Sequence, residues 1–382
     1  MRLQRRTAVV AASLALALAA GPLAAPVFAA SDPRVPAAAC SWTTGPDTEA
    51  LAAALAGIPD DKVTAAQIRV GGKGSWHGAA GVRDVRTGAP VLEHGRFRAG
   101  STTKVVTASI VLQLVAEGRI DLDGTVQEYL PGLLTDDFRE PVTVRQLLTY
   151  TSGLQPGAGF GDTTEEMFPH RFETLTPREV VAAAVAKGPA YTPGERQTYG
   201  NIHYTVLGML IEKVTGDSYA HQARVRVFRP LGMHGSSFPA GPDPRVHGPH
   251  NRGYEWIDGE LVDVTEWNMS DRFAAGDLIS TTADLERLLK GVFGGRVVPP
   301  ALLKEMLTLP PVEGARYGMA LETFKLNGRQ VWGKSGSRPG YATGIAATPD
   351  LCRTVVFSVN ATDARSNGLG IAQRFAFPAF NR

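Results

Sequence analysis

The chain has 382 residues, of which 43% are hydrophobic and 20% are charged, an ordinary composition for a globular protein. Its formal net charge is +2, but the first thirty residues contribute three arginines and no acid, so the rest of the chain carries −1. A near-neutral charge gives no electrostatic basis for binding nucleic acid or an anionic membrane, and we expect neither partner.

The first 29 residues have the pattern of a signal peptide. A basic start precedes an apolar run from Ala8 to Ala20, and Val27-Phe28-Ala29 suits a cleavage site. A membrane anchor is the alternative, but Gly21-Pro22 interrupts the run of about 20 apolar residues that a span needs. We therefore expect cleavage of 1–29, a secreted or extracytoplasmic protein and no membrane span. The export route and the oligomeric state stay open.

Residues 30–47 are rich in Ala, Pro and Asp, which predicts a flexible lead-in to a domain over residues 48–382. The chain contains two cysteines, Cys40 and Cys352. In an oxidising compartment they could form a disulfide that joins the start of the chain to a late strand. Two free thiols are the alternative.

The first predicted elements of the domain are a helix and a pair of strands. Asp47 to Leu55 has helical character, and Ala66 to Val91 contains two extended runs broken by glycines, which predicts a hairpin. After residue 100 the period changes to that of a helix ending near Gly118. Its apolar residues cover nearly every side: Val105, Val106, Ile110, Val111, Leu112, Leu114 and Val115. A helix apolar all round is buried, so Ser101 is predicted at the N-terminus of a central buried helix.

Residues from about 119 to 268 mix short helical stretches with Pro- and Gly-rich loops, which predicts a mostly helical lobe. Its helix candidates are 144–149, 177–186 and 202–214. Later helices are expected at 282–293, 301–307 and 369–377, and extended runs at 317–326, 330–332, 340–347 and 353–359. Strands at both ends with helices between them predict an α/β fold, with one sheet built from both chain ends and an inserted helical lobe.

The first motif with chemical potential is Ser101-Thr102-Thr103-Lys104, an S-x-x-K tetrad. Residues three apart on a helix share a face, so the hydroxyl and the amine are expected to meet. A lysine whose pKa is lowered by burial or by a neighbouring cation can take the serine proton. The free N–H groups at the helix start can also face an oxyanion. A capping serine beside an exposed lysine is the alternative.

A second group, Tyr199-Gly200-Asn201, directly precedes the helix predicted from Ile202. The tyrosine phenol could relay a proton to the leaving group, and the asparagine amide could orient a substrate. As alternatives, Asn201 is a helix N-cap and Tyr199 a packing aromatic.

A third group, Lys334-Ser335-Gly336-Ser337, falls in the late extended region. It could form a strand edge that pairs with an extended substrate. Its lysine would lower the pKa values of neighbouring groups, its hydroxyls would bind a carboxylate, and Gly336 would allow close approach. A surface hairpin of small residues is the alternative.

S-x-x-K, then a second triad, then K-[TS]-G is the arrangement of serine β-lactamases and penicillin-binding proteins. Over residues 95–360 the chain resembles the class C β-lactamase and D-alanyl-D-alanine carboxypeptidase family, nearest to the secreted actinomycete carboxypeptidases. The segments that carry the resemblance are 97–101, 142–154, 199–216, 230–233, 274–285 and 333–341. It implies the β-lactamase/transpeptidase-like fold, an antiparallel sheet flanked by helices.

The resemblance also implies residue roles. Ser101 would form the acyl-enzyme, Lys104 would activate it, and Tyr199 would transfer protons. The backbone N–H groups of Ser101 and Ser337 would form the oxyanion hole. The residues expected to bind substrate are Asn201, Lys334, Ser335, Gly336 and Ser337.

The function implied is a D-alanyl-D-alanine carboxypeptidase acting on peptidoglycan stem peptides. Its substrate would be a D-Ala-D-Ala-ended peptide or an ester, with β-lactams as acylating ligands. The alternatives are an esterase or D-amino-acid peptidase of the same fold, a class C-like β-lactamase, and a catalytically silent penicillin-binding module. Hydrolysis and transpeptidation are not distinguished.

Two departures from the family pattern concern substrate recognition. The actinomycete carboxypeptidases place an arginine after a strand resembling Tyr317–Leu321, where it grips the terminal carboxylate of the peptide; this chain has Glu322. They also carry a histidine where this chain has Lys334. One hypothesis is that Lys334 and Ser337 replace the missing grip.

Other catalytic patterns do not occur in the sequence. The H-E-x-x-H pattern is absent, which disfavours a zinc hydrolase, and there is no G-x-S-x-G elbow or dinucleotide fingerprint. We therefore expect neither metal nor cofactor.

Overall fold

The computed structural model describes residues 40, 42, 44–239, 241–364 and 368–380. The predicted signal peptide, 1–29, and most of the predicted lead-in lie outside these residues. No helix in the described ranges combines the length and the apolar character needed to cross a bilayer.

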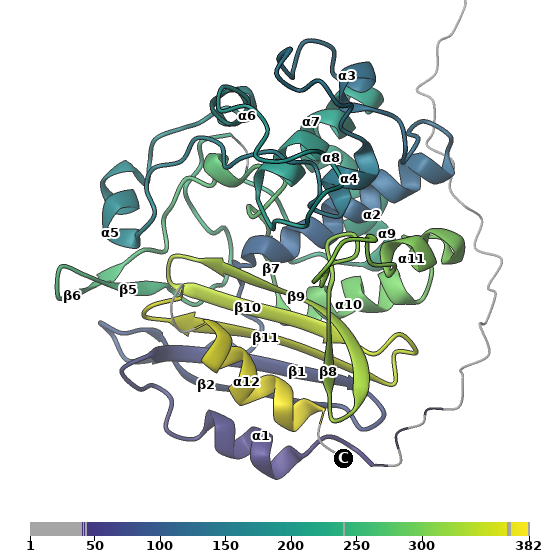
Figure 1. Cartoon of the computed structure of the whole chain (residues 1–382). Coiled ribbons are helices and arrows are strands. Elements are labelled where there is room, and N and C mark those ends of the chain that lie inside the picture. The colour runs from purple at the N-terminus through teal and green to yellow at the C-terminus, as the bar shows by residue number, and fades with distance from the viewer. Residues whose placement is uncertain (1–39, 41, 43, 240, 365–367, 381–382) are drawn as a thin grey trace, which may run out of the picture. The chain divides into compact units, whose positions relative to one another are not determined.

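A seven-stranded antiparallel sheet with the order β3-β2-β1-β11-β10-β9-β8 forms the base of the fold (Figure 1). The first strand of the domain pairs with the last, with Ile68 opposite Phe357, so the sheet is built from both chain ends as predicted. Its strands are β1 (Val63–Gly72), β2 (Trp76–Asp84), β3 (Ala89–Pro90), β8 (Glu322–Leu326), β9 (Arg329–Arg338), β10 (Tyr341–Ala347) and β11 (Arg353–Ala361).

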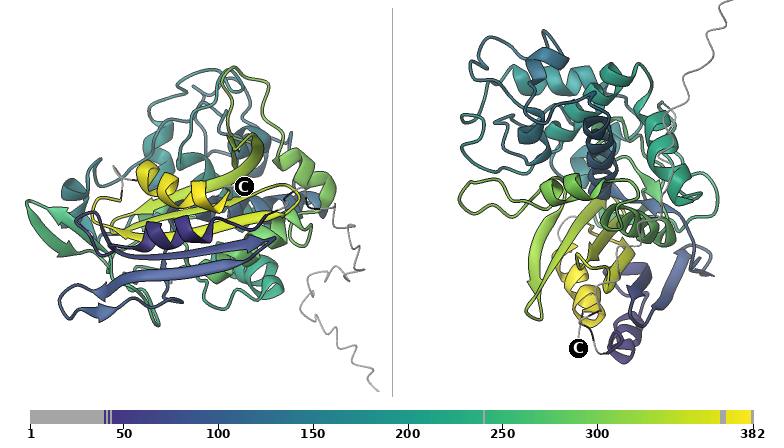
Figure 2. Two further views of the ribbon diagram at one scale, coloured as in Figure 1. Left: turned by 90° about the horizontal axis from the view of Figure 1, so that it is seen from below. Right: turned by 90° about the vertical axis from the view of Figure 1, so that its right-hand side faces the viewer.

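Helices cover both faces of this sheet (Figure 2). Helices α1 (Thr48–Leu55) and α12 (Gly368–Ala379) pack together on one face, above an apolar cluster that includes Ile68 and Phe357. Helix α10 (Thr282–Phe293) contacts β1, β10 and β11 from the other face, where the larger core cluster begins. The predicted α/β fold with a helix-flanked antiparallel sheet is therefore confirmed.

Short helices dominate the segment between the N-terminal and C-terminal strands: α3 (Val126–Tyr129), α4 (Val144–Leu148), α5 (Thr164–Met167), α6 (Pro177–Val185), α7 (Ile202–Thr215), α8 (Tyr219–Ala223) and α9 (Arg229–Leu231). The first four each begin at a threonine whose side chain forms a reciprocal capping box with the residue three positions on. Such caps satisfy the first free N–H groups, which stabilises helices too short to stand alone.

Two of the departures from the predicted elements concern the strands β5 (Tyr254–Ile257), β6 (Glu260–Asp263) and β8. A hairpin of β5 and β6 lies in the stretch predicted without strands, joined by Asp258 and Gly259, both with positive φ. Such a turn matches the twist of paired strands. The extended run predicted at 317–326 is a strand only from Glu322, because Ala320 has a φ of 68° and the chain turns there.

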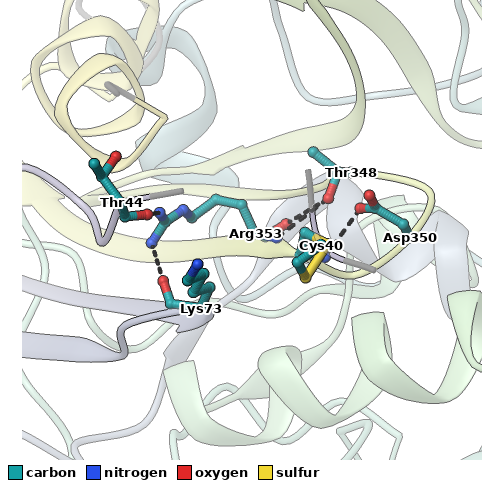
Figure 3. The surroundings of a disulfide bond; sticks show 7 residues. Cys40, Thr44, Lys73, Thr348, Asp350 and Arg353 are labelled. Carbon is teal, nitrogen blue, oxygen red and sulfur yellow. Dashed lines mark hydrogen bonds between the residues drawn. A yellow bond between two sulfur atoms is a disulfide. The ribbon is translucent and has the colours of Figure 1, made fainter. Parts of the chain in front are cut away.

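Cys40 and Cys352 form a disulfide with Cα atoms 5.4 Å apart, in agreement with one of the two alternatives that the sequence left open. The guanidinium of Arg353, which is fully buried, donates to the carbonyl oxygens of Thr44 (3.1 Å) and Lys73 (2.9 Å), as Figure 3 shows. The bridge and these bonds fasten the start of the described chain to β11.

Loss of this bridge should destabilise the domain. It joins residues 312 positions apart, and removing such a cross-link enlarges the conformational freedom of the unfolded chain. We expect the double change of Cys40→Ser and Cys352→Ser to lower the free energy of unfolding by about 2–4 kcal/mol. Urea unfolding with and without reductant measures the difference, and an unchanged midpoint would contradict the assignment.

Candidate active site

Ser101 lies in a short 3₁₀ turn, Gly100–Thr102, between strand β4 (Phe97–Arg98) and helix α2 (Thr103–Ala116). Gly100 has a φ of 53°, and a Cβ there would lie 2.5 Å from the backbone nitrogen of Ser337. Only glycine suits both constraints. The chain can therefore bring Ser101 close to strand β9 immediately before the buried helix begins.

Lys104 is fully buried one turn after Ser101, and its ammonium group has three oxygen partners. Its Nζ donates to Ser101 Oγ (3.1 Å), to Asn201 Oδ1 (2.7 Å) and to the carbonyl oxygen of Ala275 (2.6 Å). Burial lowers the pKa of Lys104 to about 8, and the charge of Lys334 contributes to the shift although Tyr199 opposes it. A lysine with this pKa exchanges protons near neutral pH.

Tyr199 completes the group around Ser101. Its hydroxyl donates to Ser101 Oγ over 2.8 Å, and the ammonium groups of Lys104 and Lys334 lie 5.1 and 4.8 Å from its ring centre. Burial disfavours the phenolate, but the two lysine charges and the bond to Ser101 outweigh it and lower the pKa to about 7. Because 39% of the residue is exposed, a substrate can reach it.

Asn201 occupies the N-cap position of α7, but its side chain makes no capping bond there. The amide oxygen instead accepts from Lys104. Asn201 is therefore the N-cap residue of α7, as the alternative predicted, but its side chain contacts the Ser101 and Lys104 pair instead of capping the helix.

Two buried aromatic residues that the sequence analysis did not single out hold Tyr199 in place. The ring centre of Tyr150 lies 5.0 Å from that of Tyr199. The backbone carbonyl of Tyr150 accepts a hydrogen bond from the N–H of Thr198, the residue before Tyr199. His203 bridges Ser152 Oγ (2.8 Å) and the Thr198 carbonyl (3.1 Å), and burial lowers its pKa to about 4, so it stays neutral. Tyr150 has a φ of 61°, a conformation no sequence pattern indicates.

Strand β9 passes directly over the Ser101 turn. A Cβ at Gly336 would lie 2.1 Å from the Ala99 oxygen and 2.9 Å from the Ser101 nitrogen, so any larger residue would separate the strand from the turn. Register with β10 places Lys334 opposite Ile345 and Ser337 opposite Ala342.

The side chains of β9 alternate between the two faces of the strand. Lys334 is buried and donates to the carbonyl of Ser335 (2.8 Å), on the side of Tyr199. Ser335 and Ser337 are exposed, and the Ser337 hydroxyl donates to the Ala364 carbonyl (3.2 Å). The hypothesis that Lys334 and Ser337 bind the substrate carboxylate needs the Ser337 hydroxyl as a donor, but that hydroxyl already donates to Ala364.

Glu322 begins β8 opposite Gly333, next to Lys334. Its carboxylate forms an ion pair with Arg316 and accepts a hydrogen bond from the Tyr317 hydroxyl (3.1 Å). The Tyr317 ring in turn packs 5.5 Å from that of Tyr199. The position where the resemblance implies a carboxylate-binding arginine is therefore occupied by an acid already engaged with a cation.

No group of three or more His, Cys, Asp or Glu side chains in the described part of the chain is arranged to hold a metal ion. The chemical capacity of the site lies in a hydroxyl in contact with an amine and a phenol, both with pKa values near neutrality. That arrangement is suited to acyl transfer through a serine ester.

Replacing Lys334 with Met should move the pH dependence of the site. The Lys334 charge lowers the pKa values of both Lys104 and Tyr199, so its removal raises both. We expect the acid limb of kcat/KM, near pH 7 in the wild type, to shift to higher pH. Lys325→Met, at an exposed position on strand β8, is the control, and an unmoved limb in Lys334→Met would contradict the electrostatic coupling.

The chain belongs to the beta-lactamase family, whose sequence model matches residues 51–375. Its fold is similar to that of a D-stereospecific amidohydrolase from Streptomyces sp., with a TM-score of 0.74 and 31% identity, covering 87% of this chain and 97% of that one. A D-amino acid amidase from Ochrobactrum anthropi SV3 gives the same TM-score and coverage at 25% identity.

Among curated proteins, the chain is 33% identical to penicillin-binding protein 4 of Amycolatopsis lactamdurans over 226 residues. That alignment covers 58% of this chain and 57% of the relative, so the chain matches little more than half of its length. The chain therefore has the fold of the serine hydrolases of the beta-lactamase family.

Proposed function

We propose that this chain is a D-stereospecific amidohydrolase, which cleaves amide or peptide bonds on the carbonyl side of a D-configured residue. The observation that carries the choice is Glu322. A D-alanyl-D-alanine carboxypeptidase must bind a terminal carboxylate on the leaving group, but Glu322 and its ion-pair partner Arg316 offer no uncompensated positive charge there. An amide that releases ammonia or a neutral amine brings no such charge. The similarity to a D-stereospecific amidohydrolase and a D-amino acid amidase supports the same choice.

In the proposed mechanism, Ser101 is the nucleophile and Tyr199 and Lys104 handle its proton. Tyr199 has a pKa of about 7 and Lys104 a pKa of about 8, so near neutral pH the phenol loses its proton before the ammonium group does. The Tyr199 oxygen takes the Ser101 proton as Oγ attacks the carbonyl carbon, while the Lys104 ammonium stabilises the developing negative charge. The N–H groups of Ser101 and Ser337 stabilise the oxyanion.

Collapse of the tetrahedral intermediate breaks the C–N bond, and Tyr199 returns the proton to the departing nitrogen. A water molecule then attacks the acyl ester on Ser101, with Tyr199 again accepting a proton. The bond between the acyl carbon and Oγ breaks, Tyr199 returns the proton to Ser101 Oγ, and the D-acid is released. The same nucleophile would be acylated by β-lactams and by esters, because both present a carbonyl carbon to Ser101.

Stereospecific turnover tests the proposal. We expect D-phenylalaninamide to release ammonia with a kcat/KM at least about tenfold above that of L-phenylalaninamide and of an acetylated D-Ala-D-Ala peptide. Glu322→Arg should raise cleavage of the D-Ala-D-Ala peptide relative to the D-amide by about tenfold, since charge-assisted bonds to the terminal carboxylate become possible. Glu313→Arg places the same charge at an exposed site nearby and should leave the ratio unchanged.

A D-alanyl-D-alanine carboxypeptidase is the second candidate, favoured by the exposed position of Ser335 on strand β9, beside the Lys334 cation. Preferential release of D-Ala from the peptide by the wild type would select it and overturn the amidohydrolase proposal. Equal turnover of D- and L-amides would overturn D-stereospecificity.

We also propose that the protein is exported and loses residues 1–29. The basic and apolar pattern of that segment supports this. N-terminal sequencing of protein recovered outside the producing cells tests it, with a start at Ala30 expected and retention of Met1 contradicting it.

A further inference from the structure

A pocket of about 540 Å³ opens beside Tyr199 and Asn201, on the lobe side of the site. The loop from Leu154 to Asp162 forms its opposite wall, and none of its lining residues belongs to β8 or β9. The pocket is therefore separate from the wall that carries Lys334 and Glu322. Its volume is in the range of small-molecule sites and is much larger than an alanine methyl group needs.

Arg272 runs along the wall of this pocket from the nucleophile toward the loop. Gly276 lies between Arg272 and the turn that carries Ser101. A Cβ built on Gly276 would be 3.3 Å from the Arg272 Cβ and 3.8 Å from the carbonyl carbon of Gly100. Arg272 Nη1 lies 4.0 Å from a Cβ placed at Gly159 in the opposite wall. The positive charge also acts on the site, since it is one of the causes that lower the pKa of Lys104.

The charges around Arg272 leave an excess of positive charge. Asp271 is only 1% exposed and lies between two guanidinium groups, 2.9 Å from Arg272 Nη1 and 3.3 Å from Arg338 Nη2. Arg338 is 4% exposed and Arg272 is 23% exposed, so Arg272 is the member that reaches the pocket. Asp277, buried nearby, has its pKa raised to about 7 by burial and offsets this charge only in part at neutral pH.

The guanidinium of Arg272 retains donors for a ligand. Within the described residues its only hydrogen-bond and ion-pair partner is Asp271, reached through Nη1. At the rim, Lys187 and Asp162 are exposed and opposite in sign, and water screens both. A partly buried guanidinium with free N–H groups forms strong paired bonds with a carboxylate.

We therefore propose that this pocket is an acyl-side subsite for a carboxylate, bound by Arg272. The inference rests on the proposed amidohydrolase function, because it concerns which D-residue the enzyme prefers. The carboxylate can belong to the side chain of the D-residue itself or to an acyl group on its nitrogen. The side chain and the acyl group both belong to the acyl part of the substrate. Either one would therefore place its carboxylate on the opposite side of the scissile carbonyl from the leaving group.

Two pairs of substrates separate these sources. The first is D-glutamic acid α-amide with D-glutamine α-amide, and the second is N-succinyl-D-phenylalaninamide with its succinamoyl analogue. Ammonia release gives kcat/KM for each. We expect the charged member of at least one pair to be preferred about tenfold, and the pair that shows the preference identifies the source.

Arg272→Gln should remove that preference, measured as the ratio of kcat/KM between the charged and the neutral member of a pair, and Arg272→Lys should keep part of it. Arg178→Gln, on an exposed turn of α6, is the matched control and should leave it intact. Equal rates for both members of both pairs in the wild type, or a preference that survives in Arg272→Gln, would overturn the subsite and leave the amidohydrolase proposal standing. If neither pair nor D-phenylalaninamide is hydrolysed, the proposed function itself fails.

Discussion

Replacing Ser101 with Ala is expected to lower kcat/KM for amide hydrolysis by about 10³- to 10⁶-fold, the range found when a serine nucleophile is removed. The loss follows from the geometry, since Ser101 Oγ is the atom that both Lys104 Nζ and the Tyr199 hydroxyl contact. Steady-state kinetics on D-phenylalaninamide measures it. Binding of the substrate should change far less, because the pocket and strand β9 keep their shape.

A serine on the same helix provides the control for this variant. Ser109 is buried in α2, and its hydroxyl donates only to the Val105 carbonyl one turn earlier. Ser109→Ala should therefore leave kcat/KM within about twofold, and both variants should unfold at similar temperatures. Residual activity above a tenth of the wild type in folded Ser101→Ala would mean that another group attacks the substrate.

The second large effect is expected for Lys104→Met, which keeps an unbranched side chain and removes the ammonium group. Removing one positioned donor that stabilises developing negative charge costs about 10²- to 10³-fold, and we expect kcat/KM to fall by a factor in that range. Because the Lys104 charge lowers the pKa of Tyr199, the remaining activity should also show its acid limb at higher pH than the wild type.

Lys187→Met is the control for the loss of a lysine near the site. Its ammonium group is exposed at the pocket rim and donates to the Pro156 carbonyl, away from Ser101. Its kcat/KM and pH profile for D-phenylalaninamide should match the wild type. A Lys104→Met enzyme with an unchanged profile would show that Tyr199 ionises without help from the lysine.

Local spacing was sufficient to bring Ser101 and Lys104 together, because three residues on a helix fix the relative direction of two side chains. The sheet from both chain ends was likewise predictable, since extended runs at the two termini need partners and the helices between them cannot supply any. The contact between Ser101 and Lys104 and the composition of the sheet each follow from one rule that can be applied to the sequence alone.

Other features depend on tertiary contacts that no local rule contains. Asn201 has the sequence position of a helix cap, yet its amide turns to Lys104, almost a hundred residues earlier in the chain. Tyr150 supports Tyr199 from a left-handed conformation that its sequence neighbours do not require. The run before Glu322 has strand-like residues, but a positive φ at Ala320 turns the chain and brings Tyr317 to the site.

The most direct test of Ser101 as the acyl-forming nucleophile is mass spectrometry of the protein after exposure to benzylpenicillin. We predict a mass increase of one penicillin per chain, mapped by peptide fragmentation to Ser101 and lost in Ser101→Ala. An adduct on a different residue, an adduct that persists in Ser101→Ala, or an unmodified protein after prolonged exposure would contradict an acyl-enzyme on Ser101.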